Sequence, residues 1–175
     1  MSDLRTLVAG AIADLCTRFE RGGYNPTPIV DLGVLVARAD GKVDEHEREA
    51  LREVFEALLD ERLNSEVVGH LIAASLEVIE LAGVDARARL IAEILKDCDA
   101  VEQGLLVALG IAFASEGLSN DERAVITKIA DVAGMSHERL DALAEKVRAK
   151  VEEAGGPDSA RSSLHIPISR QTFRG

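Results

Sequence analysis

Apolar residues recur at helical spacing along nearly the whole chain. The first stripe places one apolar side chain on each successive turn of a single helix face and stops at Gly22-Gly23. No segment shows the strict apolar–polar alternation of a half-buried strand. The pattern therefore predicts an all-α fold. The residues of this first stripe are Leu4, Leu7, Val8, Ala11, Leu15 and Phe19.

Start and stop signals divide the pattern into about eight helices. Thr27, Ser65, Asp85, Ser119 and Ser136 are predicted as N-caps, and Gly83 and Gly134 as stops. Asp99 and Glu102 are predicted to form a capping box at the start of the sixth helix. Connections of about two to eight residues fit a compact bundle of mostly antiparallel neighbours. The segments 29–39 and 99–114 are apolar on almost every side, which indicates two buried central helices. The other predicted helices cover residues 4–21, 44–63, 65–82, 85–96, 119–133 and 136–154.

A short acidic turn occurs twice, in the stretches 36–48 and 111–123. The two stretches, VARADGKVDEHER and IAFASEGLSNDER, align without a gap at a distance of 75 residues. Each copy reads as an apolar helix, a turn, and a second helix opened by a capping residue. The repeat predicts internal two-fold character, with the central helices side by side and both turns at the same end of the domain.

The two turns carry a surplus of carboxylates that suits a divalent cation. Hard oxygen ligands are those that calcium, magnesium and manganese prefer. Carboxylates that converge from both turns would repel one another, and a bound cation, or a nearby arginine such as Arg48 or Arg123, would relieve that strain. The candidate metal ligands are Asp40, Asp44 and Glu47 from the first turn, and Glu116 and Glu122 from the second.

Helix capping is a second explanation for most of these residues. A Ser or Asp followed three residues later by Glu is a capping box, and Asp44 with Glu47, like Ser119 with Glu122, fits it. Capping does not require Asp40 or Glu116. Asp40 is therefore the residue that structure explains least, and Gly41 beside it is expected to have a positive φ angle.

Charge and composition narrow the classes of partner. The chain has a formal charge of −11, and beyond Ala154 one acid meets three bases, so the body carries −13 and the end +2. Such a body repels phosphate backbones and anionic membrane surfaces, which argues against nucleic acid. No signal peptide and no membrane-spanning stretch are evident, and we expect a cytoplasmic protein without membrane insertion. Protein partners are expected, and a homodimer is left open.

The last residues differ in character from the rest. The stretch 155–175 contains two prolines and no periodic stripe. We therefore predict a helical domain over residues 1–154 and a flexible tail over 155–175. Docking of the tail through its apolar residues on a groove or partner is the alternative.

Motifs for catalysis are absent from the sequence. HEREA at His46 and HERLD at His137 lack the second histidine of a zinc-protease helix, and the turn at Asp40 does not follow the EF-hand pattern. No phosphate-binding glycine loop and no nucleophile elbow occur. Cys16 and Cys98 indicate buried reduced thiols rather than a disulfide framework. The sequence thus predicts a protein that is not an enzyme.

The repeated turn resembles the tellurite-resistance TerB family and its TerB-like relatives. The similarity covers most of residues 29–143 and rests on Ala39-Asp40-Gly41, Val43, Asp44, Glu47 and Leu51, with Gly117, Leu118, Ser119, Glu122 and Ile129 in the second copy. The resemblance implies an all-helical fold with two-fold character and a metal-binding acidic centre using Asp40, Glu47 and Glu122. It also implies a cytoplasmic role in stress-response or membrane-associated complexes. Ser115 stands where a second aspartate is expected, and Glu116 is the substitute one position later.

Two functions follow as hypotheses. The first is a TerB-like, non-enzymatic domain of stress-response complexes with a divalent cation (calcium, magnesium or manganese) at the junction of the two turns. The second is a scaffold or co-chaperone-like interaction module without metal, in which the turns serve only as caps.

Overall fold

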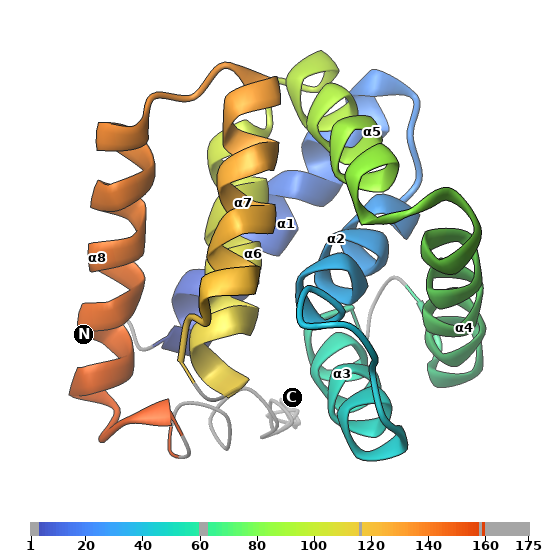
Figure 1. Cartoon of the computed structure of the whole chain (residues 1–175), viewed down its shortest axis with the longest axis horizontal. Coiled ribbons are helices and arrows are strands. Elements are labelled where there is room, and N and C mark those ends of the chain that lie inside the picture. The colour runs from blue at the N-terminus through green and yellow to red at the C-terminus, as the bar shows by residue number, and fades with distance from the viewer. Residues whose placement is uncertain (1–3, 60–62, 116, 158, 160–175) are drawn as a thin grey trace, which may run out of the picture.

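The computed structural model describes residues 4–59, 63–115, 117–157 and 159. Over these residues the chain forms helices and no strand, which confirms the predicted all-α class. The helices are α1 (Leu4–Gly22), α2 (Thr27–Ala37), α3 (Glu45–Leu59), α4 (Ser65–Ala82), α5 (Val84–Asp97), α6 (Val101–Ser115), α7 (Asn120–Ala133) and α8 (His137–Glu153) (Figure 1).

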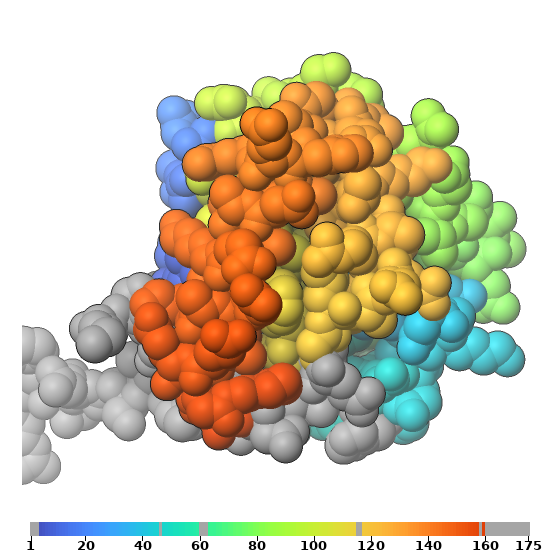
Figure 2. All heavy atoms as spheres, turned by 60° about the vertical axis from the view of Figure 1, so that its left-hand side comes forward, coloured from blue at the N-terminus to red at the C-terminus, as the bar shows by residue number. Residues whose placement is uncertain are grey.

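The two apolar helices occupy the interior, as predicted. In α2 every residue from Ile29 to Val36 is buried, and α2 packs against α4, α5 and α6. Helix α6 packs in turn against α1, α7 and α8, and Figure 2 shows α8 and α7 side by side on one face of the molecule. Helices that are apolar on all sides lose the most contact with water in such a position. The direct packing of α2 on α6 confirms the predicted pairing, while two-fold symmetry between the halves stays a prediction.

Gly33 allows α2 to approach its neighbours closely. A Cβ atom added there would collide with the ring of Phe55 in α3 and would lie 3.0 Å from Cδ1 of Ile111 in α6. The Phe55 side chain is fully buried. A residue without a side chain is therefore required where α2, α3 and α6 meet.

Several helix starts differ from the sequence prediction by one or two residues. Asn64, not Ser65, caps α4, and its side chain accepts a hydrogen bond from the backbone nitrogen of Val67 at 2.9 Å. Thr27 is the first residue of α2 and provides no cap. Asp85 lies inside α5, which begins at Val84. The N-cap positions of α2, α4 and α5 are held by Pro26, Asn64 and Gly83, each next to or close to the residue that sequence spacing indicates.

The predicted domain boundary follows α8, which ends at Glu153. Most of the predicted tail, residues 158 and 160–175, lies outside the described residues. Among the described helices none is by itself long and apolar enough to cross a membrane. Helices α4 and α5 reach that length and composition only when taken together, and they meet at an angle of 119°.

Candidate functional site

The first acidic turn connects α2 to α3 and is closed by a reciprocal cap. The backbone nitrogen of Glu47 donates to Oδ1 of Asp44 at 2.8 Å, and the backbone nitrogen of Asp44 donates to Oε2 of Glu47 at 2.7 Å. Gly41 has a φ of +129°, the left-handed conformation expected for this turn. One oxygen of each carboxylate thus satisfies a backbone N–H at the start of α3.

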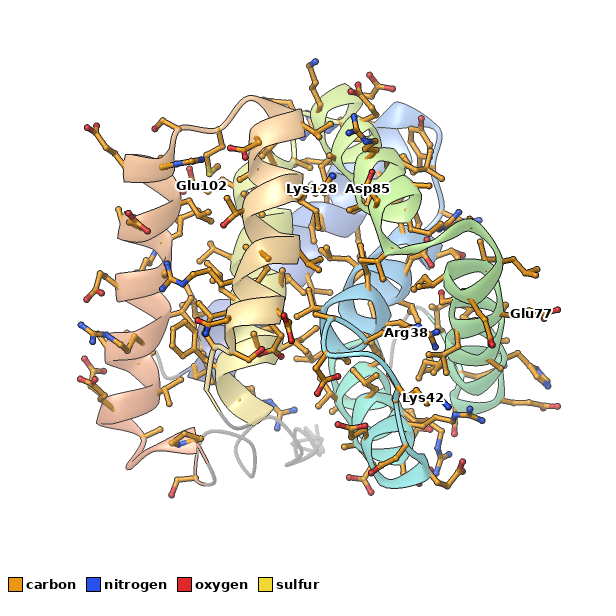
Figure 3. The ribbon with its side chains drawn as sticks, in the orientation of Figure 1. Arg38, Lys42, Glu77, Asp85, Glu102 and Lys128 are labelled. Carbon is orange, nitrogen blue, oxygen red and sulfur yellow. The ribbon has the colours of Figure 1, made fainter. Side chains whose placement is uncertain are left out.

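Asp40 is exposed at the tip of the same turn and takes no part in this cap. Its neighbours include two cations, Arg38 and Lys42, which lie at the end of α2 and in the turn (Figure 3). Asp40 therefore remains the carboxylate of this turn that helix capping does not explain.

The second acidic turn repeats the cap with a serine. The backbone nitrogen of Glu122 donates to Oγ of Ser119 at 3.2 Å, and the backbone nitrogen of Ser119 donates to Oε2 of Glu122 at 2.9 Å. Gly117 has a φ of +94°, matching the glycine of the first turn. Glu116, the predicted substitute ligand, lies outside the described residues.

The predicted ligands within the described residues do not gather into one metal-binding group. Within residues 4–59, 63–115, 117–157 and 159, no three His, Cys, Asp or Glu side chains form a group that could hold a metal ion. Asp44, Glu47 and Glu122 instead share a role at helix N-termini, where the positive end of the helix dipole attracts carboxylates and repels cations. Because Glu116 lies outside these residues, the metal site made by the full predicted ligand set stays a prediction.

A buried carboxylate that sequence reasoning did not select lies in the middle of the fold. Asp31 in α2 is only 5% exposed. Its Oδ1 accepts a hydrogen bond from Oγ of Ser75 in α4 at 2.6 Å, and its Oδ2 accepts one from the guanidinium of Arg87 in α5. The signal was present in the sequence, because a lone charged residue in an apolar helix must find a partner once it is buried. Its partners, 44 and 56 residues away, could not be read from local spacing.

A shallow groove with basic residues runs between α7 and α5. It is lined by Arg123 and Lys128 of α7 and by Arg89 of α5. Each of these cations already has an acidic partner: Asp85 contacts Lys128 and lies 3.1 Å from Arg89, and Asp141 lies 3.7 Å from Arg123. Figure 3 shows Lys128 and Asp85 next to each other where α7 meets α5. The positive charge of the groove is therefore partly neutralised by acids of the protein itself.

The two cysteines, Cys16 and Cys98, lie in the core. Both thiols are buried and reduced, as predicted. Burial, with a smaller contribution from the negative charge of Asp97, raises the pKa of the Cys98 thiol above its usual value. A raised pKa lowers the fraction of reactive thiolate at neutral pH.

A protein family matches the part of the chain that contains both acidic turns. The model of the family described as tellurite resistance protein TerB matches residues 28–145, which include α2 from its second residue, the whole of α3 to α7 and the first half of α8. Comparison with curated proteins and comparison with solved structures each gave no match. The family match covers more than half of the chain and spans the residues on which the sequence resemblance rests. The chain therefore belongs to the TerB family.

Proposed function

We propose that this TerB-family protein is a non-enzymatic cytoplasmic domain that binds another protein within a stress-response complex. The observation that carries the proposal is an acid-rich surface, which we call the acidic α3 face and define as the charged residues of the stretch 40–59. This stretch has seven carboxylates against three cations, a formal charge of −4. The carboxylates are Asp40, Asp44, Glu45, Glu47, Glu49, Glu53 and Glu56.

Local ion pairs neutralise only part of this face. Arg52 contacts Glu49 and lies 2.9 Å from Glu56, and Arg48 lies 3.8 Å from Glu45, all on the same helix. Exposed pairs of this kind contribute little to stability, so their side chains rearrange readily when a partner binds. The opposite side of α3 is held in the core by Leu51, Val54, Phe55 and Leu59, which makes the acidic face rigid.

A partner with a basic surface or basic segment fits this face. Complementary charge increases the rate of encounter and disfavours acidic partners and nucleic acid. The capping geometry supports the same proposal, because Asp44 and Glu47 are explained without a metal and the turn is preorganised as a fixed surface feature. The proposal corresponds to the interaction module that was the second hypothesis from the sequence.

Affinity capture from the source cells with a charge-reversed variant tests this proposal. In Glu45→Lys/Glu53→Lys, two exposed carboxylates of the acidic α3 face are reversed. In the matched control Glu145→Lys/Glu152→Lys, two exposed carboxylates are reversed on α8. We expect a defined protein that is recovered by the wild type and the α8 variant, lost from the α3 variant, and eluted by raised salt. Equal recovery by both variants contradicts the proposal.

Divalent-cation binding at the acidic turns is a second candidate function. It is favoured by the exposed position of Asp40 and by the second oxygens of the capping pair, Oδ2 of Asp44 and Oε1 of Glu47, which the reciprocal cap does not use. Glu116 and Glu122 of the second turn would complete the ligand set. Calcium, magnesium or manganese matches these oxygen donors.

Isothermal titration with calcium, magnesium and manganese decides this second candidate. Binding that is lost in Asp40→Ala and retained in Glu45→Ala supports it, because both variants remove one exposed carboxylate from the same end of α3. Absence of binding by the wild type, or an equal loss in both variants, contradicts a specific site. Either result leaves the protein-binding proposal to be judged by the capture experiment alone.

A further inference from the structure

Helix α4 lies at the edge of the fold, beside α2, α3 and α5 (Figure 1). Its core-facing side chains are buried: Val68, Ile72, Ser75, Leu76 and Ile79. A second apolar row follows the same helix on an adjacent face. We call this row the α4 stripe, and it consists of Val67, Leu71, Ala74, Val78 and Leu81.

The α4 stripe is open to solvent over most of its length. Leu81 is 81% exposed, and Val67 and Val78 are 38% and 37% exposed. Leu71 is half-buried and Ala74 is exposed. In the described part of the chain, four large apolar residues have exposed side chains, and three of them are Val67, Val78 and Leu81. Apolar exposure is therefore concentrated on α4.

The spacing within the stripe is that of a helix-pairing seam. Successive members are separated by four, three, four and three residues, the alternation that places side chains along one face of a helix that packs against another helix. Ala74 stands at the centre, with Val67 seven residues before it and Leu81 seven residues after it. A two-fold interface has to be complementary to itself, and a stripe centred on a small residue meets that requirement.

We propose that the α4 stripe pairs with the α4 stripe of a second copy of this chain in an antiparallel dimer. With Ala74 next to the two-fold axis, Val67 lies level with Leu81 of the second copy. His70 and Glu77 of the second copy then differ in height by only one residue, which is about 1.5 Å along the helix axis. The two small side chains at the axis allow the helices to approach closely.

The polar side chains beside the stripe select this register. His70 and Glu77 are exposed on the flank of the α4 stripe, and Figure 3 shows Glu77 projecting from α4 away from the body of the molecule. In the antiparallel arrangement an imidazole N–H donates to the Glu77 carboxylate at two equivalent places. Shifting the axis toward Glu77 brings the two Glu77 side chains opposite each other, which is repulsive. Charge complementarity therefore favours a second copy with Ala74 at the axis.

A single helix pair buries less surface than a standard interface, so the dimer is expected to be in exchange with the monomer. Sedimentation velocity at physiological ionic strength, from micromolar to near-millimolar protein, should show the mass rising from 18.7 kDa toward twice that value. A monomer throughout the series overturns the proposal and assigns the stripe to a different partner.

Two neighbouring alanines provide a matched pair of variants. Ala74→Glu places two carboxylates at the axis, whereas Ala73→Glu adds the same charge on the polar flank; both positions are exposed, so both variants should keep the helical circular dichroism of the wild type. We expect Ala74→Glu to remain monomeric and Ala73→Glu to dimerise as the wild type does. A dimer that persists in Ala74→Glu, or is lost equally in both, overturns the assigned interface.

Cysteine crosslinking tests the antiparallel direction. Ala74→Cys should form a disulfide-linked dimer under mild oxidation, because the two introduced thiols meet at the axis. Val67→Cys should not crosslink with itself, but should do so when mixed with Leu81→Cys. The native Cys16 and Cys98 are buried and supply the background level in wild-type protein. Efficient self-crosslinking of Val67→Cys indicates a parallel pair and overturns the antiparallel arrangement.

Discussion

Arg87 of α5 donates a hydrogen bond to the carboxylate of Asp31, which lies in the buried middle of α2. Ser75 of α4 donates to the other oxygen of the same carboxylate. The three residues therefore fix the relative positions of three helices around one buried charge. Ion pairs in such positions contribute mainly through the cost of breaking them, since the remaining charge is left without a partner.

Arg87→Ala is expected to destabilise the protein by about 3 kcal/mol, because Asp31 then remains buried with only Ser75 to stabilise its charge. For a chain of this size the loss corresponds to a fall in Tm of roughly 6–12 °C in thermal unfolding. The exposed Arg89 on the same helix provides the control, and Arg89→Ala should change Tm little. Similar Tm values for the two variants would show that the Asp31–Arg87 contact is not important for stability.

The reciprocal caps of α3 and α7 should contribute similar stability. Asp44→Ala and Ser119→Ala each remove the side chain that accepts from the third residue of its helix, at a cost of about 1 kcal/mol in urea-induced unfolding. Asp40→Ala, at an exposed position outside the cap, should change the free energy of unfolding by less than about 0.5 kcal/mol. A larger effect for Asp40→Ala than for Asp44→Ala would contradict the assigned division of roles.

Two glycine-to-alanine substitutions should change the free energy of unfolding in opposite directions. Gly33→Ala introduces a methyl group against the ring of Phe55 and should destabilise the protein by about 1–3 kcal/mol. Gly10→Ala, in the exposed face of α1 with open space around it, should stabilise by about 0.5–1 kcal/mol through helix propensity. Chemical unfolding of both variants measures the difference, and equal effects would indicate that α2 is not closely packed.

The Cys98 thiol should react slowly with an alkylating reagent at neutral pH. Burial raises its pKa, so the thiolate forms only at higher pH than in a free cysteine. The rate should rise toward alkaline pH, with its midpoint displaced upward relative to glutathione, and unfolding in denaturant should remove the displacement. Rapid reaction of the native protein at neutral pH would falsify the assignment of Cys98 as an inert core residue.

Local sequence predicted most helix boundaries because their causes are local. The Ser119–Glu122 cap, the left-handed Gly134 and the Ser136 cap each depend on residues within one or two turns of helix. The predicted box of Asp99 with Glu102 is wrong for the opposite reason. Arg18, far away in sequence, binds the backbone oxygen and the side chain of Asp99, and Arg139 binds Glu102. Long-range partners thus replaced the local bonds.

In the candidate site, too, local sequence explains some features and tertiary packing decides the others. The sequence repeat alone indicates the carboxylates of both turns, and the capping-box pattern predicts the roles of Asp44, Glu47 and Glu122 at helix starts. Whether Asp40, Glu116 and Glu122 meet in one place depends on how α2 and α6 cross, which no local pattern specifies. The sequence also contained the α4 stripe, but only the fold showed which apolar face of α4 the core leaves uncovered.

The sequence by itself determined the helices, the two central apolar segments, the capped acidic turns and the family, because hydrophobic periodicity and capping act over a few neighbouring residues. Tertiary structure alone decided that Asp31 pairs with Ser75 and Arg87, that Gly33 faces Phe55, and that Leu81 stays in solvent. These outcomes depend on which helix surfaces meet, and that choice is made by the packing of the whole core.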